Sequence, residues 1–179
     1  MRRIGEVLVA HAEASADRSA SADALLGALI ARLAPGADAR VGRRCAVCGG
    51  TDHGAPVALG APVVLSAAYA GGLVVAAGAP SARVSAVGID AEPGAAGTIL
   101  TELSNLVDPP PSLREWTRIE AALKADGRGL RVPPDAVRLD GDAARVPGRA
   151  DPIALIDVPS PAGLVVSLAV AARPPRATR

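Results

Sequence analysis

The sequence predicts an α+β protein, and three observations support this class. Segments with strand-like alternation or short apolar runs are interspersed along the chain with segments of helical spacing. Half of the 179 residues are hydrophobic, which is enough for one domain with a core or for two small fused lobes. The tetrapeptide GLVV occurs at 72–75 and again at 163–166, each time after a turn and at the start of an apolar strand. This repeat is compatible with two similar α+β lobes packed together.

The first half of the chain is expected to contain one helix among several strands. Leu and Ile recur at helical spacing over residues 25–33, and Pro35 and Gly36 end the run. The Gly- and Arg-rich residues 37–56 predict a loop. The segments with the pattern of strands are 4–12, 62–68, 72–78 and 83–92.

The second half is expected to contain two helices followed by strands. Residues 98–107 have the apolar spacing of a short helix, and three prolines at 109–111 form a stiff linker after it. The sequence SLRE, with Ser112 at the cap and Glu115 three positions later, is a capping box that starts the next helix. The segments that predict strands are 135–141, 151–158 and 163–172.

Charge and hydropathy exclude two classes of partner. The net charge of +1 gives no basic field for nucleic acid or for an anionic membrane surface. Residues 54–82 carry no charge over a length that could span a membrane, but three prolines and the pair Gly71-Gly72 interrupt them, so two strands explain the run better. The first residues do not have the pattern of a signal peptide. We therefore expect a soluble, cytoplasmic protein.

Cys45 and Cys48 form a single CxxC pair, followed by His53. A structural zinc site usually has four ligands, commonly from two such pairs, and here a second pair is missing. We expect a small buried thiol pair, with a metal or redox role as the alternative.

The strand that ends in GIDAE could carry chemistry. Side chains at i and i+2 of a strand share a face, so Asp90 and Glu92 would lie side by side, roughly 7 Å apart at the backbone. Two such carboxylates repel each other unless a cation or proton lies between them, and Mg²⁺ is the natural cation. An exposed acidic strand end is the alternative, but the apolar run from Val84 to Ile89 favours a buried strand that delivers the acids to a cleft.

The helix that follows Ser112 places Trp116, Glu120 and Lys124 four residues apart, on one face. Trp116 and Leu123 suggest that this face turns inward, where Glu120 would need Lys124 or a metal as its counter-charge. From spacing alone, a surface Glu–Lys pair worth a few tenths of a kcal/mol is the more ordinary interpretation. Taken with GIDAE, however, the three carboxylates and the lysine indicate Mg²⁺-dependent phosphoryl-type chemistry.

The two motifs together, VGIDAE at 87–92 and REWTRIEAALKADGRGL at 114–130, resemble the 4′-phosphopantetheinyl transferases. The short actinobacterial type, related to surfactin-synthetase-activating enzymes, is the most similar. The family pattern pairs G-[IV]-D-x-E with W-[TS]-x-K-E-A-x-x-K-A-x-G-x-G-L. Weaker matches are RCAVCGGTDHGAP at 44–56, LSAAYAGGLVVAAG at 65–78 and GLVVSLAV at 163–170. The matching positions of the two main motifs are Gly88, Asp90, Glu92, Trp116, Glu120, Ala121, Lys124, Gly127, Gly129 and Leu130.

This resemblance implies a fold and a reaction. The fold would be two similar α+β lobes, residues 1–93 and 94–179, related by a pseudo-twofold axis with the active site in the cleft between them. The reaction would be Mg²⁺-dependent transfer of phosphopantetheine from coenzyme A to a serine of an acyl or peptidyl carrier protein. Two fused lobes of this kind would work as a monomer.

The resemblance also implies roles for individual residues. Asp90, Glu92 and Glu120 would hold Mg²⁺ against the coenzyme A pyrophosphate. Glu120 would take the serine proton, and Lys124 would neutralise charge on the transferred phosphate and on the departing 3′,5′-ADP. The residues that would bind coenzyme A are Arg18, Arg44, His53, Ser66 and Tyr69.

Three departures from the family pattern support a second hypothesis. Tyr69 stands where the family has His, and Ala55 and Ile119 stand where it has Lys. Each lost charge-assisted contact would cost about 1.5–3 kcal/mol of coenzyme A binding. The alternative is a divergent, non-catalytic homologue that binds a carrier protein or metal without transferring the arm.

Overall fold

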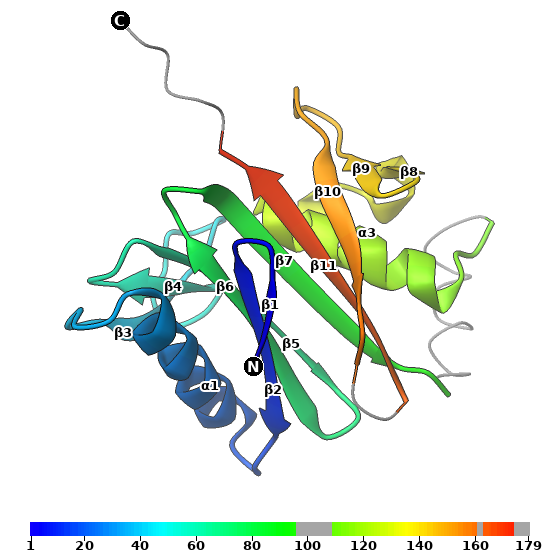
Figure 1. Ribbon diagram of the computed structural model, residues 1–179. Helices are drawn as coiled ribbons and strands as arrows, with labels where there is room; N and C mark the ends of the chain where they lie inside the picture. Colours follow the sequence, from blue (N-terminus) through cyan, green and yellow to red (C-terminus); the bar gives the residue numbers. More distant parts are fainter. Residues whose placement is uncertain (96–108, 161–162, 174–179) are drawn as a thin grey trace, which may run out of the picture.

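The computed structural model describes residues 1–95, 109–160 and 163–173 of the chain (Figure 1). These residues form a mixture of helices and antiparallel sheets, which confirms the predicted α+β class at this level. The two α-helices of the described residues are α1 (Arg18–Leu33) and α3 (Leu113–Asp126). Two short 3₁₀ helices follow α3, at Gly129–Arg131 and Pro134–Ala136.

A four-stranded antiparallel sheet in the first half of the chain has the order β1-β2-β6-β5. A separate hairpin of β3 and β4 lies beside it. The bounds are β1 (Arg2–Ile4), β2 (Val7–Glu13), β3 (Arg40–Arg44), β4 (Ala55–Leu59), β5 (Val63–Ala70) and β6 (Leu73–Pro80).

A second antiparallel sheet of five strands has the order β7-β11-β10-β9-β8. The bounds are β7 (Val84–Pro93), β8 (Arg138–Asp140), β9 (Ala143–Arg145), β10 (Ile153–Val158) and β11 (Leu164–Ala172). Strand β7, which precedes the predicted lobe boundary at residue 93, pairs along its length with β11. The division into 1–93 and 94–179 stays a prediction.

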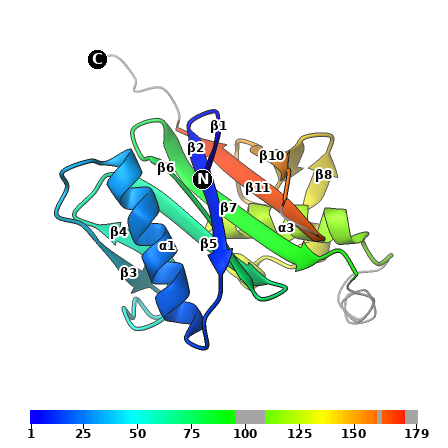
Figure 2. The same ribbon diagram turned by 60° about the horizontal axis from the view of Figure 1, so that its bottom comes forward.

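Three apolar clusters hold these elements together. One cluster lies between the two sheets and joins the valines and alanines of β2 and β6 to those of β7 and β11. A second packs α1 on the first sheet, and a third packs α3 on the second sheet. Each sheet therefore has a helix on its outer face, as Figures 1 and 2 show. Because aromatics are only 1% of the chain, these clusters consist almost entirely of aliphatic side chains.

Several local predictions are confirmed. Strands β5 and β6 pair across the turn at Gly71 and Gly72, whose φ angles of 55° and 78° are those that glycine adopts readily. The capping box at Ser112 starts α3, and Gly127, with φ 83°, ends it. The two GLVV copies open β6 and β11, each an inner strand of its sheet.

Other local predictions were wrong. Residues 4–12 do not form one strand, because a tight turn at Gly5 and Glu6 folds β1 back on β2. The predicted loop over 37–56 contains β3 and the start of β4. The helix expected over 98–107 lies outside the described residues. None of the described helices is long and apolar enough to cross a membrane.

Candidate functional site

Strand β7 and helix α3 pack against each other unusually closely, and Gly88 makes this possible. A Cβ atom at Gly88 would lie 1.9 Å from the carbonyl oxygen of Ala121 and 2.6 Å from the amide nitrogen of Ala125. Strand alternation places Asp90 and Glu92 on the same side of β7 as Gly88, whereas Ile89 points into the core between the sheets. The acidic end of β7 therefore faces α3.

Lys124 of α3 reaches across this contact to β7. Its Nζ atom donates to Oδ1 of Asp90 at 2.7 Å and to the backbone carbonyl of Ile89 at 3.1 Å. The Asp90 side chain is 9% exposed and that of Lys124 is 32% exposed, so the ion pair is largely shielded from water. Spacing alone favoured an ion pair between Glu120 and Lys124 within the helix. In the structure Lys124 of α3 instead pairs with Asp90 of β7.

Glu92 and Glu120 share the electrostatic environment of this pair. Burial, together with the charges of Asp90 and Glu120, raises the pKa of Glu92 from 4.5 to about 7, and Lys124 opposes the shift. Burial and the charge of Asp90 raise the pKa of Glu120. Burial also raises the pKa of Asp90, against the effect of Lys124. Three carboxylates with raised pKa values beside one lysine form a site with an excess of negative charge, which a further cation would stabilise.

The oxygen atoms of this group fit a hard divalent cation such as Mg²⁺. Oδ2 of Asp90 is buried and has no hydrogen-bond partner within the described ranges. A buried, unpartnered carboxylate oxygen is costly unless a cation or proton satisfies it. Asp90, Glu92 and Glu120 do not place one carboxylate oxygen each within 4.8 Å of one another, so they do not form a closed ligand cluster. Bound Mg²⁺ usually keeps several water molecules and takes phosphate oxygens beside its carboxylates, so an open arrangement suits it.

A cavity of about 400 Å³ opens beside Lys124, and Asp90, Glu92 and Glu120 are not among the described residues that line it. Lys124, Ser66 and Arg44 line it, which brings together three of the residues predicted from the sequence. Ser66 also fixes the position of β7, because its Oγ accepts a hydrogen bond from the Ile89 amide at 3.0 Å. Arg128 is a lining residue that the sequence analysis missed. The sequence could have indicated Arg128, because it directly follows Gly127, the residue that ends α3 one turn after Lys124.

Two other predicted residues form a separate pair. The guanidinium carbon of Arg18 lies 4.6 Å from the centre of the Tyr69 ring, which is a cation–π contact. Tyr69 and Ser66 are three positions apart on β5, so they point to opposite faces of the strand. Neither Arg18 nor Tyr69 is among the described residues that line the cavity.

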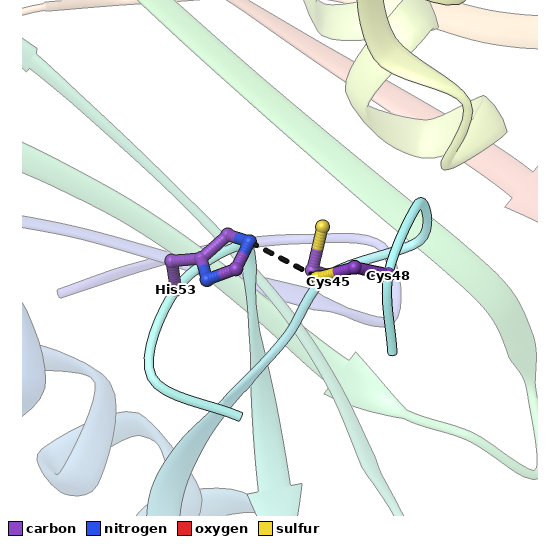
Figure 3. Close-up of side chains that lie close together, drawn as sticks. All are labelled: Cys45, Cys48 and His53. Carbon is purple, nitrogen blue, oxygen red and sulfur yellow. Dashed lines mark hydrogen bonds between the residues drawn. The ribbon is translucent and has the colours of Figure 1, made fainter. Parts of the chain in front are cut away.

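His53 lies in the loop between β3 and β4 with Cys45 and Cys48 (Figure 3). The prediction of a buried thiol pair was wrong, because Cys48 is exposed and Cys45 is only half-buried. Backbone amides of Cys48 and Val47 lower the pKa of the Cys45 thiol to about 7. The contact with Asp52 raises the pKa of His53.

Comparison with models of known protein families gives no match, and comparison with curated proteins gives none either.

Proposed function

We propose that this chain is a Mg²⁺-dependent 4′-phosphopantetheinyl transferase. It would move the phosphopantetheine arm from coenzyme A to a serine hydroxyl of an acyl or peptidyl carrier protein. The observation that carries the proposal is the gathering of Asp90, Glu92, Glu120 and Lys124 at the contact between β7 and α3, with Oδ2 of Asp90 unpartnered among the described residues. The resemblance requires these four side chains to meet, although Glu120 follows Glu92 by 28 positions in the sequence.

Each side chain has a part in this reaction. Asp90, Glu92 and Glu120 would hold Mg²⁺, which supplies positive charge next to the pyrophosphate of coenzyme A. Glu120 would accept the proton of the serine hydroxyl, and the raised pKa that burial gives its carboxylate makes it a stronger base. The serine oxygen then forms a bond to phosphorus, the bond from phosphorus to the 3′,5′-ADP oxygen breaks, and 3′,5′-ADP leaves.

Lys124 would stabilise the charge that develops on the transferred phosphate. Its ammonium group has three N–H donors, and Asp90 and the Ile89 carbonyl take two of them. The third donor remains for a phosphate oxygen in the adjoining cavity, where Arg44 also lies. Cations placed in advance at a partly shielded site lower the barrier without reorganising during the reaction.

The proposal includes the two-lobe architecture. Each GLVV copy opens an inner strand of an antiparallel sheet, and among the described residues a helix packs on the outer face of each sheet. These parallels support two similar units that face each other sheet to sheet. The candidate site lies where β5 of one sheet meets β7 of the other, because Ser66 of β5 bonds the backbone of β7.

A non-catalytic homologue remains the second candidate, and two observations favour it. Ile119 is only 5% exposed and belongs to the apolar cluster under α3, so this position contributes no cation to the site. Ala55 lines the cavity where the family pattern has Lys. A protein of this kind would bind a carrier protein without modifying it.

The test is to incubate the chain with coenzyme A, Mg²⁺ and an apo carrier protein, and to measure the mass of the carrier protein. We expect a gain equal to the phosphopantetheine arm. Glu120→Gln should reduce the rate by about 10²–10⁴-fold, because it removes the proton acceptor and one metal ligand. Glu6→Gln makes the same change in the exposed turn between β1 and β2 and should leave the rate unaltered.

Circular dichroism should show that Glu120→Gln folds like the parent chain. No transfer to any of several carrier proteins, at saturating coenzyme A, would refute the proposal. Binding of a carrier protein without transfer would then favour the non-catalytic homologue. Transfer by Glu120→Gln at the parent rate would refute the role of Glu120 alone.

A further inference from the structure

The loop between β3 and β4 gathers three side chains that are typical ligands of a soft metal ion. The sulfur atoms of Cys45 and Cys48 and a ring nitrogen of His53 all lie within 4.8 Å of one another (Figure 3). The described part of the chain has no second group of three with this property. The candidate magnesium site contributes no residue to this group. The resemblance assigns His53 to coenzyme A binding, but His53 is not among the described residues that line the cavity beside Lys124.

The backbone of this loop is folded around the two sulfur atoms. The Val47 amide donates to Sγ of Cys45 at 3.4 Å, and the Gly50 amide donates to Sγ of Cys48 at 3.3 Å. Two backbone hydrogen bonds, from Cys45 to the Gly50 carbonyl and from Gly49 to the Cys45 carbonyl, close the loop at 2.9 and 3.0 Å. Each sulfur therefore receives an amide from the residue two positions later, and such bonds favour the thiolate form that binds metals.

Two glycines are needed for this backbone. Gly49 has a φ of 72°, a conformation that other residues rarely adopt. A Cβ atom at Gly50 would lie 3.1 Å from the sulfur of Cys48 and 3.1 Å from Cε1 of His53. A side chain at position 50 would therefore crowd the space between the cysteine and the histidine.

The His53 ring is oriented for ligation by its Nε2 atom. Its Nδ1 atom lies 2.7 Å from Oδ1 of Asp52, while Nε2 lies 3.5 Å from Sγ of Cys48. A carboxylate that accepts the Nδ1 proton leaves the lone pair of Nε2 free to face a metal, and this is the usual second partner of a metal-bound histidine. The four side chains therefore form a donor set of two sulfurs and one nitrogen with its supporting carboxylate.

We propose that Cys45, Cys48 and His53 bind one Zn²⁺ ion, with water in the fourth position. Two thiolates and an imidazole suit zinc, whereas Mg²⁺ prefers oxygen ligands. The bound ion would cross-link the two ends of the loop. Cys45 and Gly54 also line the cavity that contains Lys124, so the ion would fix one wall of that cavity. The proposal does not depend on the proposed function.

The test uses the full chain, purified under a reductant that does not bind metal, stripped with a chelator and reloaded with zinc. We expect elemental analysis after gel filtration to give one zinc per chain. Cobalt loading should give the near-ultraviolet band of thiolate-to-cobalt charge transfer and the strong visible bands of a tetrahedral site. Cys45→Ser and Cys48→Ser should lose the zinc and the charge-transfer band.

Histidine variants supply a matched pair. His53→Ala should weaken zinc binding, measured by competition with a chromophoric chelator. His11→Ala, the same change at an exposed position of β2, should not. Asp52→Asn should weaken binding by about 10–100-fold, as loss of a supporting carboxylate does elsewhere. The loop is exposed, so circular dichroism should show that every variant folds.

Three results would overturn the proposal. They are the absence of stoichiometric zinc in the reduced, reloaded chain, a cobalt spectrum without charge transfer from thiolate, and equal effects of His53→Ala and His11→Ala. None of these measurements depends on transferase activity. Failure of the zinc site and failure of the proposed function can therefore be told apart.

Discussion

Gly88→Ala is the sharpest test of how the candidate site is built. The added methyl group would lie 1.9 Å from the Ala121 carbonyl oxygen and 2.6 Å from the Ala125 amide nitrogen. Both atoms belong to the backbone of α3, which cannot move aside as a flexible side chain can. The helix would have to shift away from β7, and Lys124 would move with it.

Gly88→Ala has two opposing effects on the free energy of unfolding. Replacing glycine by alanine within a regular element usually stabilises a protein by about 0.5–1 kcal/mol, because the unfolded chain loses freedom. Overpacking a well-filled interior costs about 1–3 kcal/mol, and a clash with two backbone atoms of a packed helix belongs at the upper end. The net loss should be about 2 kcal/mol. For a chain of this length that corresponds to a fall in melting temperature of about 4–8 °C.

The same substitution at Gly27 is a matched control with the opposite expected sign. Gly27 lies within α1, and a Cβ atom there would meet nothing within 4 Å. Gly27→Ala should therefore raise the free energy of unfolding by about 0.5–1 kcal/mol. Urea and thermal denaturation, followed by circular dichroism, measure both variants. If Gly88→Ala were as stable as the parent chain, the close approach of α3 to β7 would be refuted.

Two further predictions concern charge. Asp126→Ala should lower the free energy of unfolding by about 2 kcal/mol in urea titrations, because its carboxylate is 2% exposed and pairs with Arg128 and Arg149. Asp142→Ala, whose carboxylate is 87% exposed, should change it by less than about 0.5 kcal/mol, and equal effects would contradict the burial argument. In EDTA, Glu92 should contribute stability below pH 4.5 that is lost as the pH rises through about 7, because its folded pKa is raised from 4.5 to about 7. Glu92→Gln should flatten this part of the pH profile of unfolding free energy, and an unchanged profile would show that the carboxylate is not shielded as the structure indicates.

Local signals predicted the elements well where a few neighbouring residues decide the conformation. The turn at Gly71 and Gly72 and the capping box at Ser112 both depend on residues adjacent in sequence. The break at Gly5 and strand β3 were missed, because β1 and β3 are short, rich in arginine and without an apolar alternation to reveal them. The pairing of β7 with β11 joins segments about 80 residues apart, and no local pattern specifies such a partner.

The partner of Lys124 shows why the candidate site was only partly predictable. Helical spacing offers Lys124 the carboxylate four residues earlier, Glu120, and that contact requires nothing beyond α3 itself. The structure gives it Asp90 instead, because β7 has no side chain at Gly88 and the two backbones can meet there. Glu120 is thereby left without Lys124 as its direct partner, half-buried and with a raised pKa. The glycine of the GIDAE motif, not the spacing of the charged residues, decides which carboxylate remains available to a metal or a proton.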